Sequence, residues 1–510
     1  MLSKVLSAHV IGIDAHLVEV EVDISGKGLP HFSIVGLPDA AVKESRDRIK
    51  AALKNIGFNF PLKQITVNLA PADLKKEGSS FDLPIAVGII AAEGVITTGS
   101  LDSFIVAGEL SLDGKIKPIR GGLSIALEAK RLGLKGVLLP GENAAEAAVV
   151  EGIGIYNMGS LPEAAEFLGG ISERKPFVID TSGAMAESSI YEDDFSDVKG
   201  QEYAKRALEV AAAGSHNILM IGPPGSGKTM LAKRLPSVLP PMTFDEALEV
   251  TKIHSISGLL KNGQSLLATR TFRAPHHTIS DIALIGGGQT PRPGEVSLAH
   301  HGILFLDELP EFKRNVLEVL RQPLENGIVS VSRVMASVTY PAQFVLVAAM
   351  NPCPCGYLGD LKHQCTCTPA MTNRYRSKIS GPLMDRIDIH VNVPSVPYKE
   401  LSGDYSGERS ELIRQRVTEA RERQLKRFKG DKIFANGQMK TRHIKKYCGL
   451  SSDAHGLLDT AMQRLNLSAR AYSRILKVAR TVADLDGADA IGSGHISEAI
   501  QYRMLDRGQV

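Results

Sequence analysis

The sequence predicts an α/β protein with two successive α/β regions and a helical C-terminal region. Residues 1–170 and 196–395 each mix short apolar or alternating strand patterns with amphipathic helix patterns. Residues 171–195 are polar and hold no sustained period, so we expect a linker there. From residue 396 onward the pattern becomes polar and helical, which predicts a smaller all-helical domain.

Length and composition indicate a globular chain. Its 510 residues suffice for roughly three domains with their own cores, so stability needs no disulfide. The net charge of +3 is too small to dictate a partner. His9 and Asp14 interrupt the first apolar run, and the longest run, "LPIAVGIIAA", is too short to span a bilayer. We therefore expect a cytoplasmic protein with reduced thiols and no membrane partner.

The first α/β region contains recognisable elements in order. The segments "LVEVEVDIS", "QITVNLAP" and "SFIVAGELSLDGKI" have strand patterns. The segments "DAAVKESRDRIKAALKNIG" and "LSIALEAKRLG" have the 3.6-residue period of amphipathic helices. Residues 1–170 are therefore predicted to form one α/β domain.

The second region begins with a phosphate-binding motif in its required context. "HNILMIGPPGSGKTMLAKRL" places a short apolar strand before G-x-x-x-x-G-K-T and a helix pattern after it. The glycines let backbone N–H groups face phosphates at a helix N-terminus, Lys228 is expected to reach the β and γ phosphates, and Thr229 to ligate Mg²⁺. The predicted nucleotide-binding residues are Gly222, Pro223, Pro224, Gly225, Ser226, Gly227, Lys228 and Thr229. ATP and Mg²⁺ are the expected cofactors.

Two further strands of this region end in polar residues. "GILFLDELPEF" ends in Asp307 and Glu308, and "QFVLVAAMN" ends in Asn351. We expect Asp307 to hold Mg²⁺ and Glu308 to orient or deprotonate the attacking water. Asn351 would contact the γ-phosphate or that water, although a plain loop cap is an equal alternative. Together with the P-loop, these residues predict an ATPase.

Four of the five cysteines stand close together in the sequence. Cys353 and Cys355 form one C-x-C pair, and Cys365 and Cys367 form another nine residues later. A reducing compartment disfavours disulfides, and four thiolates are the ligand set of a closed structural zinc site. We predict zinc here, with a redox-active or unligated pair as the alternative. His363 could replace one thiol, and Cys448 is expected to be an ordinary buried residue.

The order of P-loop, acidic strand and Asn-ended strand is that of AAA+ ATPases, and the region resembles that class. "FRAPHHTISDIALIGGGQTPRPGEVSLAHHGILFLDELPEF" looks like the magnesium-chelatase clade, and the whole chain resembles the ComM/YifB group of bacterial magnesium-chelatase-like ATPases. This resemblance implies an AAA+ core at 196–395, with a four-cysteine insertion at 353–367. It also implies a C-terminal helical lid at 396–510 that carries the sensor-2 helix.

Several roles follow from the resemblance by position. Arg386 matches the arginine finger that reaches a neighbouring subunit's γ-phosphate, which implies an oligomer, expected to be a homo-hexamer. Arg470 and then Arg474 match nucleotide contacts of the sensor-2 helix, the alternative being a solvated basic face.

"IGGGQTPRPGE" matches an insertion that projects into the ring's pore, although a plain turn would also suit its glycines. Metal binding is not expected at four histidines in adjacent pairs, namely His276, His277, His300 and His301.

The first region resembles the proteolytic domain of Lon, an S5-like α/β fold. Ser80, in "KKEGSSFDLPIAVGII", falls where Lon carries its nucleophile. Where Lon has its lysine base, this chain has Ser124, Ile125 and Ala126, and Lys130 lies one helical turn further on. We expect a retained fold without proteolysis, with Ser80 capping a helix that starts near Asp82.

The substrate follows more from resemblance than from residues. "ERSELIRQRVTEARERQLKRFKG" has basic residues that would suit DNA phosphates or a solvated helix. Members of the ComM group are associated with natural transformation and with DNA branch migration in homologous recombination. A ring motor acting on single-stranded or branched DNA, with possible recombination-protein partners, is therefore expected. A chelatase-like or protein-remodelling motor subunit is the alternative, and an ATP-dependent peptidase is less favoured. The basic residues are Arg414, Arg416, Arg421, Arg423, Lys426, Arg427 and Lys429.

Overall fold

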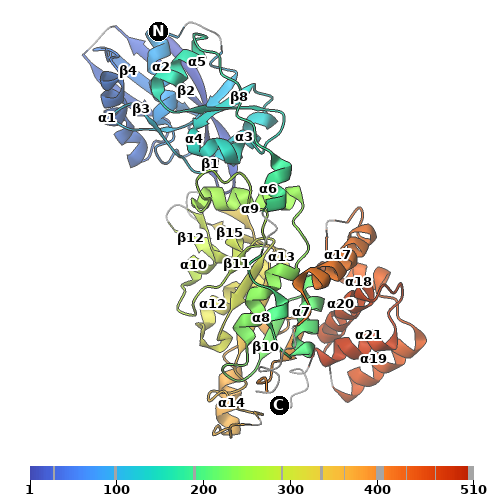
Figure 1. Ribbon diagram of the computed structural model, residues 1–510. Coiled ribbons are helices and arrows are strands. Elements are labelled where there is room, and N and C mark those ends of the chain that lie inside the picture. The colour runs from blue at the N-terminus through green and yellow to red at the C-terminus, as the bar shows by residue number, and fades with distance from the viewer. Residues whose placement is uncertain are drawn as a thin grey trace. The chain divides into compact units, whose positions relative to one another are not determined.

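The computed structural model describes residues 1–510 apart from 27–28, 97–99, 188–190, 289–290, 333–336, 361, 398–406, 432, 466 and 504–510. The chain divides into two compact units (Figure 1). The first unit comprises Met1–Ser188 and Phe244–Ala268, and the second comprises Ser189–Thr243 and Thr269–Val510. None of the helices in the described residues is long and apolar enough to cross a lipid bilayer.

A seven-stranded mixed sheet forms the frame of the first unit, in the order β3-β4-β2-β1-β5-β8-β9. β2 pairs antiparallel with β1 and β4, and the other neighbours are parallel. The strands are β1 (Leu2–Ile11), β2 (Asp14–Ser25), β3 (His31–Val35), β4 (Gln64–Ala70), β5 (Phe104–Val106), β8 (Gly136–Pro140) and β9 (Gly154–Met158), and β6 (Glu109–Leu110) pairs with β7 (Ile116–Lys117) separately.

Helices pack on this sheet and on each other. α2 is apolar on every side, as a buried helix requires, and packs on β1, β2, α1 and α5. α3 packs on β2 and β8 and also contacts α9, whose residues lie far along the chain. The helices are α1 (Ala40–Asn55), α2 (Asp82–Ala92), α3 (Gly122–Arg131), α4 (Gly141–Ala147), α5 (Leu161–Leu168), α6 (Thr181–Glu187) and α9 (Phe244–Ser257).

Most predicted elements of the first unit are present, with three differences. The expected strand "SFIVAGELSLDGKI" is broken into β5, β6 and β7, because the N–H groups of Ala107 and Gly108 bond to Leu138 and Ser80 instead of continuing one ladder. α2 starts at Asp82 as expected, but its N-cap is Phe81 and no side chain caps it, so the predicted cap by Ser80 is wrong. The predicted linker contains the short helix α6.

The second unit is built on a five-stranded parallel sheet in the order β11-β14-β17-β10-β18. Its three central strands are continuous apolar runs whose residues are all buried, as expected where both faces of a parallel sheet are covered. The strands are β10 (Ile218–Ile221), β11 (Phe272–Arg273), β14 (Ile303–Leu306), β17 (Val345–Met350) and β18 (Ile389–Asn392). Two hairpins stand apart from the sheet, β12 (Gly286–Gly287) with β13 (Arg292–Pro293) and β15 (Ile328–Ser332) with β16 (Ser337–Pro341).

Helices of the second unit fall into two groups. The first group, which precedes the C-terminal region in sequence, contains α7 (Glu202–Gly214), α8 (Lys228–Arg234), α10 (Asp281–Ile285), α11 (Glu295–Leu298), α12 (Arg314–Val319), α13 (Arg321–Asn326), α14 (Pro369–Arg376) and α15 (Gly381–Met384). The C-terminal group contains α17 (Ser410–Arg427), α18 (Thr441–Tyr447), α19 (Ser452–Arg464), α20 (Ala469–Leu485) and α21 (Ser493–Gln501). Short 3-10 helices are η1 (Phe195–Asp197), η2 (Leu235–Val238), η3 (Leu309–Glu311) and η4 (Asn436–Gln438).

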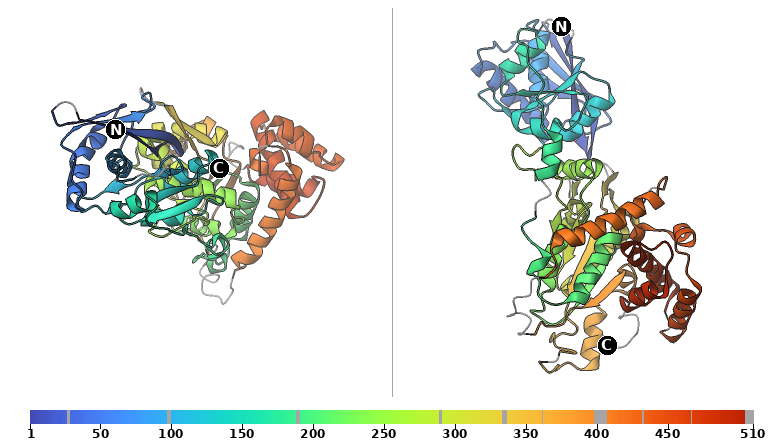
Figure 2. Two further views of the ribbon diagram at one scale, coloured as in Figure 1. Left: turned by 90° about the horizontal axis from the view of Figure 1, so that it is seen from above. Right: turned by 45° about the vertical axis from the view of Figure 1, so that its right-hand side comes forward.

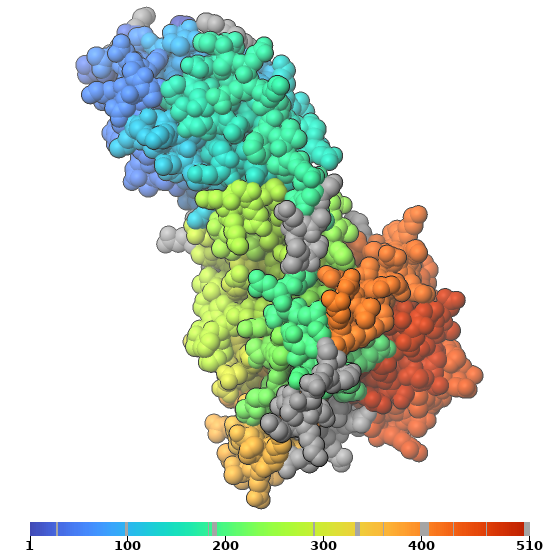
Figure 3. Space-filling model, in the orientation of Figure 1, coloured from blue at the N-terminus to red at the C-terminus, as the bar shows by residue number. Residues whose placement is uncertain are grey.

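One hydrophobic core joins the two helix groups. It includes Val347 of the sheet, Leu208 of α7 and Ile475 of α20, all fully buried. α17 and α20 both pack against α7. The orange ribbon of α17 lies beside the green segment that includes α7 in Figure 2, and the space-filling view in Figure 3 shows the same neighbours. The predicted fold class is confirmed, since a mixed α/β chain with a parallel sheet leads into a largely helical C-terminal region. The predicted domain boundaries stay predictions.

Candidate functional site

Three neighbouring parallel strands bring the predicted nucleotide residues to one edge of the sheet. The P-loop follows β10, Asp307 follows β14, and Asn351 follows β17, which lies between them. Because the carboxyl ends of parallel strands point the same way, Lys228 and Asn351 meet although 123 positions separate them in sequence. This edge is the candidate site.

The P-loop has the backbone shape that phosphate binding requires. Gly227, at φ 88°, lies in the left-handed region and leads directly into α8. A Cβ on Gly222 would lie 2.1 Å from the Val393 carbonyl oxygen, so glycine is required there as well. The free N–H groups at the start of α8 then face the loop, where the helix dipole favours an anion.

Lys228 lies inside this loop. Its Nζ donates to the carbonyl oxygens of Gly222 and Pro223 at 2.8 and 2.9 Å, and it approaches Asn351 Oδ1 at 3.4 Å. Burial lowers the pKa of Lys228 below its ordinary value, against the opposing influence of Asp307 and Glu308. The contact with Asn351 connects the P-loop to the third strand of the predicted site.

Thr229 and Asp307 form the predicted magnesium pair. Thr229 Oγ1 donates to Asp307 Oδ2 at 2.8 Å, so the two side chains share one spot beside the P-loop. A hydroxyl and a carboxylate are hard oxygen donors of the kind that Mg²⁺ prefers, together with water and phosphate oxygens. The two residues present therefore fit a phosphate-bound magnesium ion.

Glu308 has an unusual backbone and a neighbour that the sequence did not reveal. Its φ of 53° is left-handed, a strained conformation for a residue other than glycine and one found often at functional sites. Its N–H donates to Asp307 Oδ1 at 2.9 Å. The carboxylate Oε2 lies 3.5 Å from Nδ1 of His277, which follows β11. From the sequence alone this histidine matters only as a possible metal ligand, and no sequence signal pairs it with Glu308.

Two amide side chains connect segments around the site by hydrogen bonds, although neither belongs to a sequence motif. Gln201, at φ 59° before α7, donates to the carbonyl oxygens of Ser226 and Pro394. Asn217 accepts from the Leu346 N–H at 2.9 Å and donates to the Arg386 carbonyl oxygen at 2.9 Å. Both positions bridge distant segments, which local patterns in a sequence cannot show.

Arg386, the predicted arginine finger, lies in the loop between α15 and β18. Its guanidinium pairs with Glu325 Oε2 and donates to the Pro382 carbonyl oxygen at 2.6 Å. The hydrogen bond from Arg386 holds the pKa of Glu325 below its ordinary value. Nε of Arg386 is buried and, within the described residues, has no hydrogen-bond partner.

The two predicted sensor-2 arginines differ in their surroundings. Arg470 is 69% exposed and pairs with Asp385 at 2.7 Å. Arg474 pairs with the buried Asp388 at 2.7 Å, and Asp388 in turn contacts His216 at 3.1 Å. Burial lowers the pKa of His216, so Asp388 faces a neutral ring and balances Arg474. Arg474 thus fastens α20 to the sheet, whereas Arg470 is the freer of the two to reach a nucleotide.

The four clustered cysteines converge as a ligand set would. All four sulfur atoms lie within 4.8 Å of one another, and three Sγ–Sγ distances are 3.3, 3.7 and 3.6 Å. A disulfide would need about 2.05 Å, whereas a tetrahedral zinc with Zn–S bonds of about 2.3 Å sets sulfurs roughly 3.8 Å apart. The backbone N–H groups of Tyr357 and Thr366 lower the pKa of Cys355 to about 5, which favours a thiolate. The geometry is compatible with zinc.

This cysteine loop touches the nucleotide site. Gly356, at φ 87°, lies so close that a Cβ there would be 2.7 Å from Cδ of Pro224 in the P-loop. The same Cβ would lie 3.9 Å from Cγ of Asn351. His363 pairs with Asp360 at 2.8 Å, so it is not one of the four converging ligands. The loop therefore supports both the P-loop and Asn351.

Comparison with known proteins agrees with this site. Residues 194–401 match the family model "Magnesium chelatase, subunit ChlI", residues 20–143 match "Subunit ChlI of Mg-chelatase", and residues 407–503 match its C-terminal model. "Competence protein ComM" of Haemophilus influenzae is 44% identical over 512 residues, covering 99% of this chain and 98% of that protein. The chain belongs to the ComM/YifB group of magnesium-chelatase-like AAA+ ATPases.

Two further relatives differ in how much of this chain their similarity covers. "Uncharacterized protein YifB" of Salmonella typhimurium is 45% identical over 499 residues, 98% of this chain and 96% of that protein. The magnesium-chelatase 38 kDa subunit of Rhodobacter capsulatus is 26% identical over 337 residues, 61% of this chain and 87% of that protein. Full-length similarity therefore separates the ComM/YifB proteins from this chelatase subunit.

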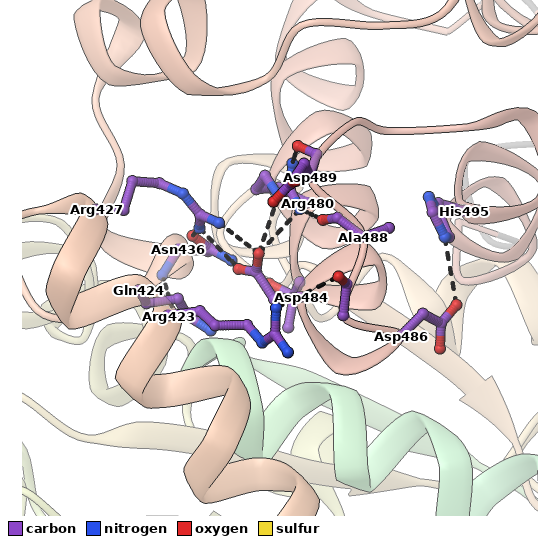
Figure 4. Close-up of polar contacts among 12 residues, drawn as sticks. Arg423, Gln424, Arg427, Asn436, Arg480, Asp484, Asp486, Ala488, Asp489 and His495 are labelled. Carbon is purple, nitrogen blue, oxygen red and sulfur yellow. Dashed lines mark hydrogen bonds and ion pairs between the residues drawn. The ribbon is translucent and has the colours of Figure 1, made fainter.

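In this protein, the basic helix α17 forms hydrogen bonds and ion pairs with other helices of the second unit. Arg416 pairs with Glu209 of α7 and with Glu408, and Arg421 donates to the Ala212 and Ala213 carbonyl oxygens. Arg427 reaches Asp484 of α20 (Figure 4). Arg416 and Arg427 are therefore paired with carboxylates inside the second unit, whereas Arg423, Lys426 and Lys429 are exposed.

The described contacts of the Ser80 region include no serine–lysine pair. Ser124, which the sequence resemblance predicts to stand where Lon has its lysine, is buried and donates to the Ile13 carbonyl oxygen at 2.7 Å. Lys130 is exposed, and no hydrogen bond or ion pair joins it to Ser80 in the described residues. The buried Lys76 donates to the Pro71 carbonyl oxygen, and burial lowers its pKa. No Ser-Lys pair is formed among these residues.

Proposed function

We propose that this protein is an ATP-hydrolysing ring motor that acts on DNA as a helicase or branch-migration factor. One observation carries the ATPase part: Lys228, Thr229, Asp307 and Asn351 converge at one edge of a parallel sheet. The DNA part is supported by the 44% identical relative named a competence protein. Homologous recombination and natural transformation are the processes in which such a motor would serve.

The proposed chemistry assigns each residue one task. Lys228 and the P-loop N–H groups bind the phosphates of MgATP, and Thr229 and Asp307 hold the magnesium ion. Glu308 orients or deprotonates the attacking water, with Asn351 positioned beside the γ-phosphate. Arg386 neutralises charge in a neighbouring subunit's site, so the working form is an oligomer, proposed to be a homo-hexamer.

A second candidate is a chelatase-like or protein-remodelling motor subunit in the cytoplasm. It is supported by the 26% identity to a magnesium-chelatase subunit over most of that protein. The intramolecular contacts of Arg416, Arg421 and Arg427 also reduce the number of basic side chains that α17 could offer to DNA. An ATP-dependent peptidase is a weaker candidate, because Ser124 stands where a lysine base is required.

ATP turnover with different stimulating substrates tests these alternatives. We expect hydrolysis to rise with forked, Holliday-type or single-stranded DNA, and strand displacement to depend on ATP. A Glu308→Gln variant provides the control for contaminating ATPases. Failure of every DNA to stimulate hydrolysis or be displaced would reject the DNA motor. Stimulation by an unfolded protein would support the second candidate instead.

We also propose that Cys353, Cys355, Cys365 and Cys367 bind one structural zinc ion. The support is the set of Sγ–Sγ distances of 3.3 to 3.7 Å and the absence of any disulfide among these residues. Zinc would brace the loop that lies against Pro224 and Asn351. Elemental analysis of purified protein should give about one zinc per chain, and less than half an equivalent would reject the assignment.

A further inference from the structure

The loop that carries Arg386 is joined to helix α20 of the same chain by two ion pairs. Asp385 Oδ2 accepts a hydrogen bond from Arg470 at 2.7 Å, and Asp388 Oδ1 accepts one from Arg474 at 2.7 Å. Arg470 and Arg474 lie one helical turn apart on α20, so the same side of this helix contacts both acids. The predicted arginine finger and the predicted sensor-2 helix are therefore linked within the second unit.

The two ion pairs differ in burial. Asp385 is 35% exposed and Arg470 is 69% exposed, so water screens their attraction and the pair contributes little. Asp388 is 2% exposed and also contacts Nδ1 of His216 at 3.1 Å. Burial raises the pKa of Asp388, but Arg474 and His216 more than offset this effect and hold that pKa below its ordinary value. The buried carboxylate is therefore charged, and removing either it or Arg474 leaves the other without its counter-charge.

A second connection leads from Asp388 back to α20. Nε2 of the fully buried His216 lies 2.7 Å from Oγ1 of Thr481, which stands two helical turns after Arg474 on the same helix. Asp388 is thus joined to α20 at two points, directly through Arg474 and indirectly through His216.

The main chain around Arg386 is fixed as well. Asn217, just before β10, donates from Nδ2 to the Arg386 carbonyl oxygen at 2.9 Å, and its own carbonyl oxygen accepts the N–H of Asp388 at 3.0 Å. Arg503 donates to the Ile387 carbonyl oxygen at 2.6 Å. The segment is thus tied to the sheet by its backbone and to α20 by Asp388. These attachments set the direction in which the backbone presents the Arg386 side chain.

We propose that Asp388 is a positioning residue for Arg386, and that together with Arg474 it holds the loop so that the guanidinium reaches the γ-phosphate bound by a neighbouring subunit. This role rests on the proposed ATPase function and on Arg386 acting in the neighbouring site. Arg474 then acts through Asp388 instead of contacting a nucleotide. Loss of Asp388 should impair hydrolysis in the neighbour, while the P-loop site of the altered subunit stays complete.

Mixed oligomers of two inactive full-length variants separate these two effects. Arg386→Ala subunits lack the finger but keep a complete P-loop site, and Glu308→Gln subunits keep the finger but lack the proposed base. Each variant alone should hydrolyse ATP slowly. An equimolar mixture should recover up to about a quarter of wild-type turnover, because about one interface in four joins an intact finger to an intact site.

Asp388→Asn is then added to one partner of the mixture at a time. Added to Glu308→Gln, it should lower the recovered turnover at least about tenfold, because the finger that this subunit supplies is misplaced. Added to Arg386→Ala, it should leave the recovered turnover within about twofold, because that subunit supplies only its P-loop site. Asp385→Asn in the Glu308→Gln subunit is the matched control, and its exposed ion pair predicts a change within about twofold.

A milder variant covers the case in which Asp388→Asn does not assemble, which size-exclusion chromatography detects. Arg474→Lys keeps a cation beside Asp388 but not the planar guanidinium, and it should show the same asymmetry between the two partners with a fall of about threefold.

The outcomes distinguish the positioning role from the proposed function. An equal fall in both placements of Asp388→Asn, no fall in either, or the same fall for Asp385→Asn would overturn the positioning role alone. If the mixture of Arg386→Ala and Glu308→Gln recovers no turnover, the finger acting between subunits is rejected, and the positioning role is rejected with it.

Discussion

The P-loop of the second unit and the Ser80 turn of the first unit both match motifs of active enzymes, but their surroundings differ. At the P-loop, neighbouring parallel strands bring Lys228 within hydrogen-bonding distance of Asn351 and Thr229 within that distance of Asp307. At Ser80, the position of the required base holds Ser124, whose hydroxyl is bonded to Ile13. A matching sequence motif therefore does not by itself bring the partner residues of a site together.

The largest effect should come from the proposed base of the second unit. Glu308→Gln should lower kcat by about 10²- to 10⁴-fold, because the amide cannot accept the proton of the attacking water. Nucleotide affinity should stay close to wild type, since Lys228 and the P-loop are untouched. Fluorescent-nucleotide titration beside a phosphate-release assay measures both quantities. If Glu308→Gln kept wild-type turnover, the P-loop site would lack its proposed base, just as the Ser80 turn lacks its expected lysine.

A second contrast concerns buried carboxylates. Asp484 of the second unit accepts hydrogen bonds from Arg427, Arg480 and Asn436 (Figure 4). Asp484→Ala should cost about 3 kcal/mol of unfolding free energy, because it leaves the buried Arg480 without its counter-charge. Denaturant unfolding followed by circular dichroism measures the loss.

The matched variant in the first unit is Asp82→Ala. Burial raises the pKa of Asp82 despite its hydrogen bonds from Arg48, so ionisation there is only partly compensated. Its single arginine is 25% exposed and can return to water when the carboxylate is removed. We therefore expect a smaller loss than for Asp484→Ala. If Asp82→Ala lost as much unfolding free energy as Asp484→Ala, or more, the number of buried donors would not determine the loss of stability.

Acid should weaken both units through one histidine in each, the buried His390 and the half-buried His9. Burial lowers the pKa of His390 in the second unit to about 3 and that of His9 in the first to about 4. Below pH 6.5 these two histidines therefore bind protons in the unfolded chain but stay neutral in the folded protein. The free energy of unfolding falls as the pH falls. Each ring should contribute about 1.4 kcal/mol per pH unit between pH 6.5 and its folded pKa.

Single variants measure how much each histidine contributes to the slope of unfolding free energy against pH. His390→Gln should flatten the fall in unfolding free energy between pH 6.5 and 4, and His9→Gln should flatten it over the same range. The two variants test different units with one measurement, denaturant unfolding at a series of pH values. A slope unchanged in both variants would contradict the assignment of neutral buried rings.

The smallest effect should be that of Ser80→Ala. With Ser124 in place of the expected lysine base, neither the wild type nor the variant should cleave peptides, and ATP turnover should stay within about twofold. A fluorogenic peptide assay in the presence of ATP measures the first quantity. Cleavage that disappears in Ser80→Ala would place a working base near this serine and erase the difference between the two motifs.

The sequence by itself determined the elements and the motifs. Continuous apolar runs followed by Gly222 to Thr229, by Asp307 and Glu308, and by Asn351 predicted a parallel sheet with a nucleotide site at its edge, and the family resemblance is confirmed. These features are local: the period of side-chain burial and the chemistry of a phosphate loop both fit within about 20 residues.

Only the tertiary structure decided which distant residues meet. The contact of His277 with Glu308 and the pairing of Arg427 with Asp484 join segments whose order in the sequence carries no trace of the contact. The predicted cap by Ser80 failed because Phe81 occupies the N-cap position of α2. The physical reason is that strand order and helix packing choose these partners, and both depend on the whole core rather than on any local pattern.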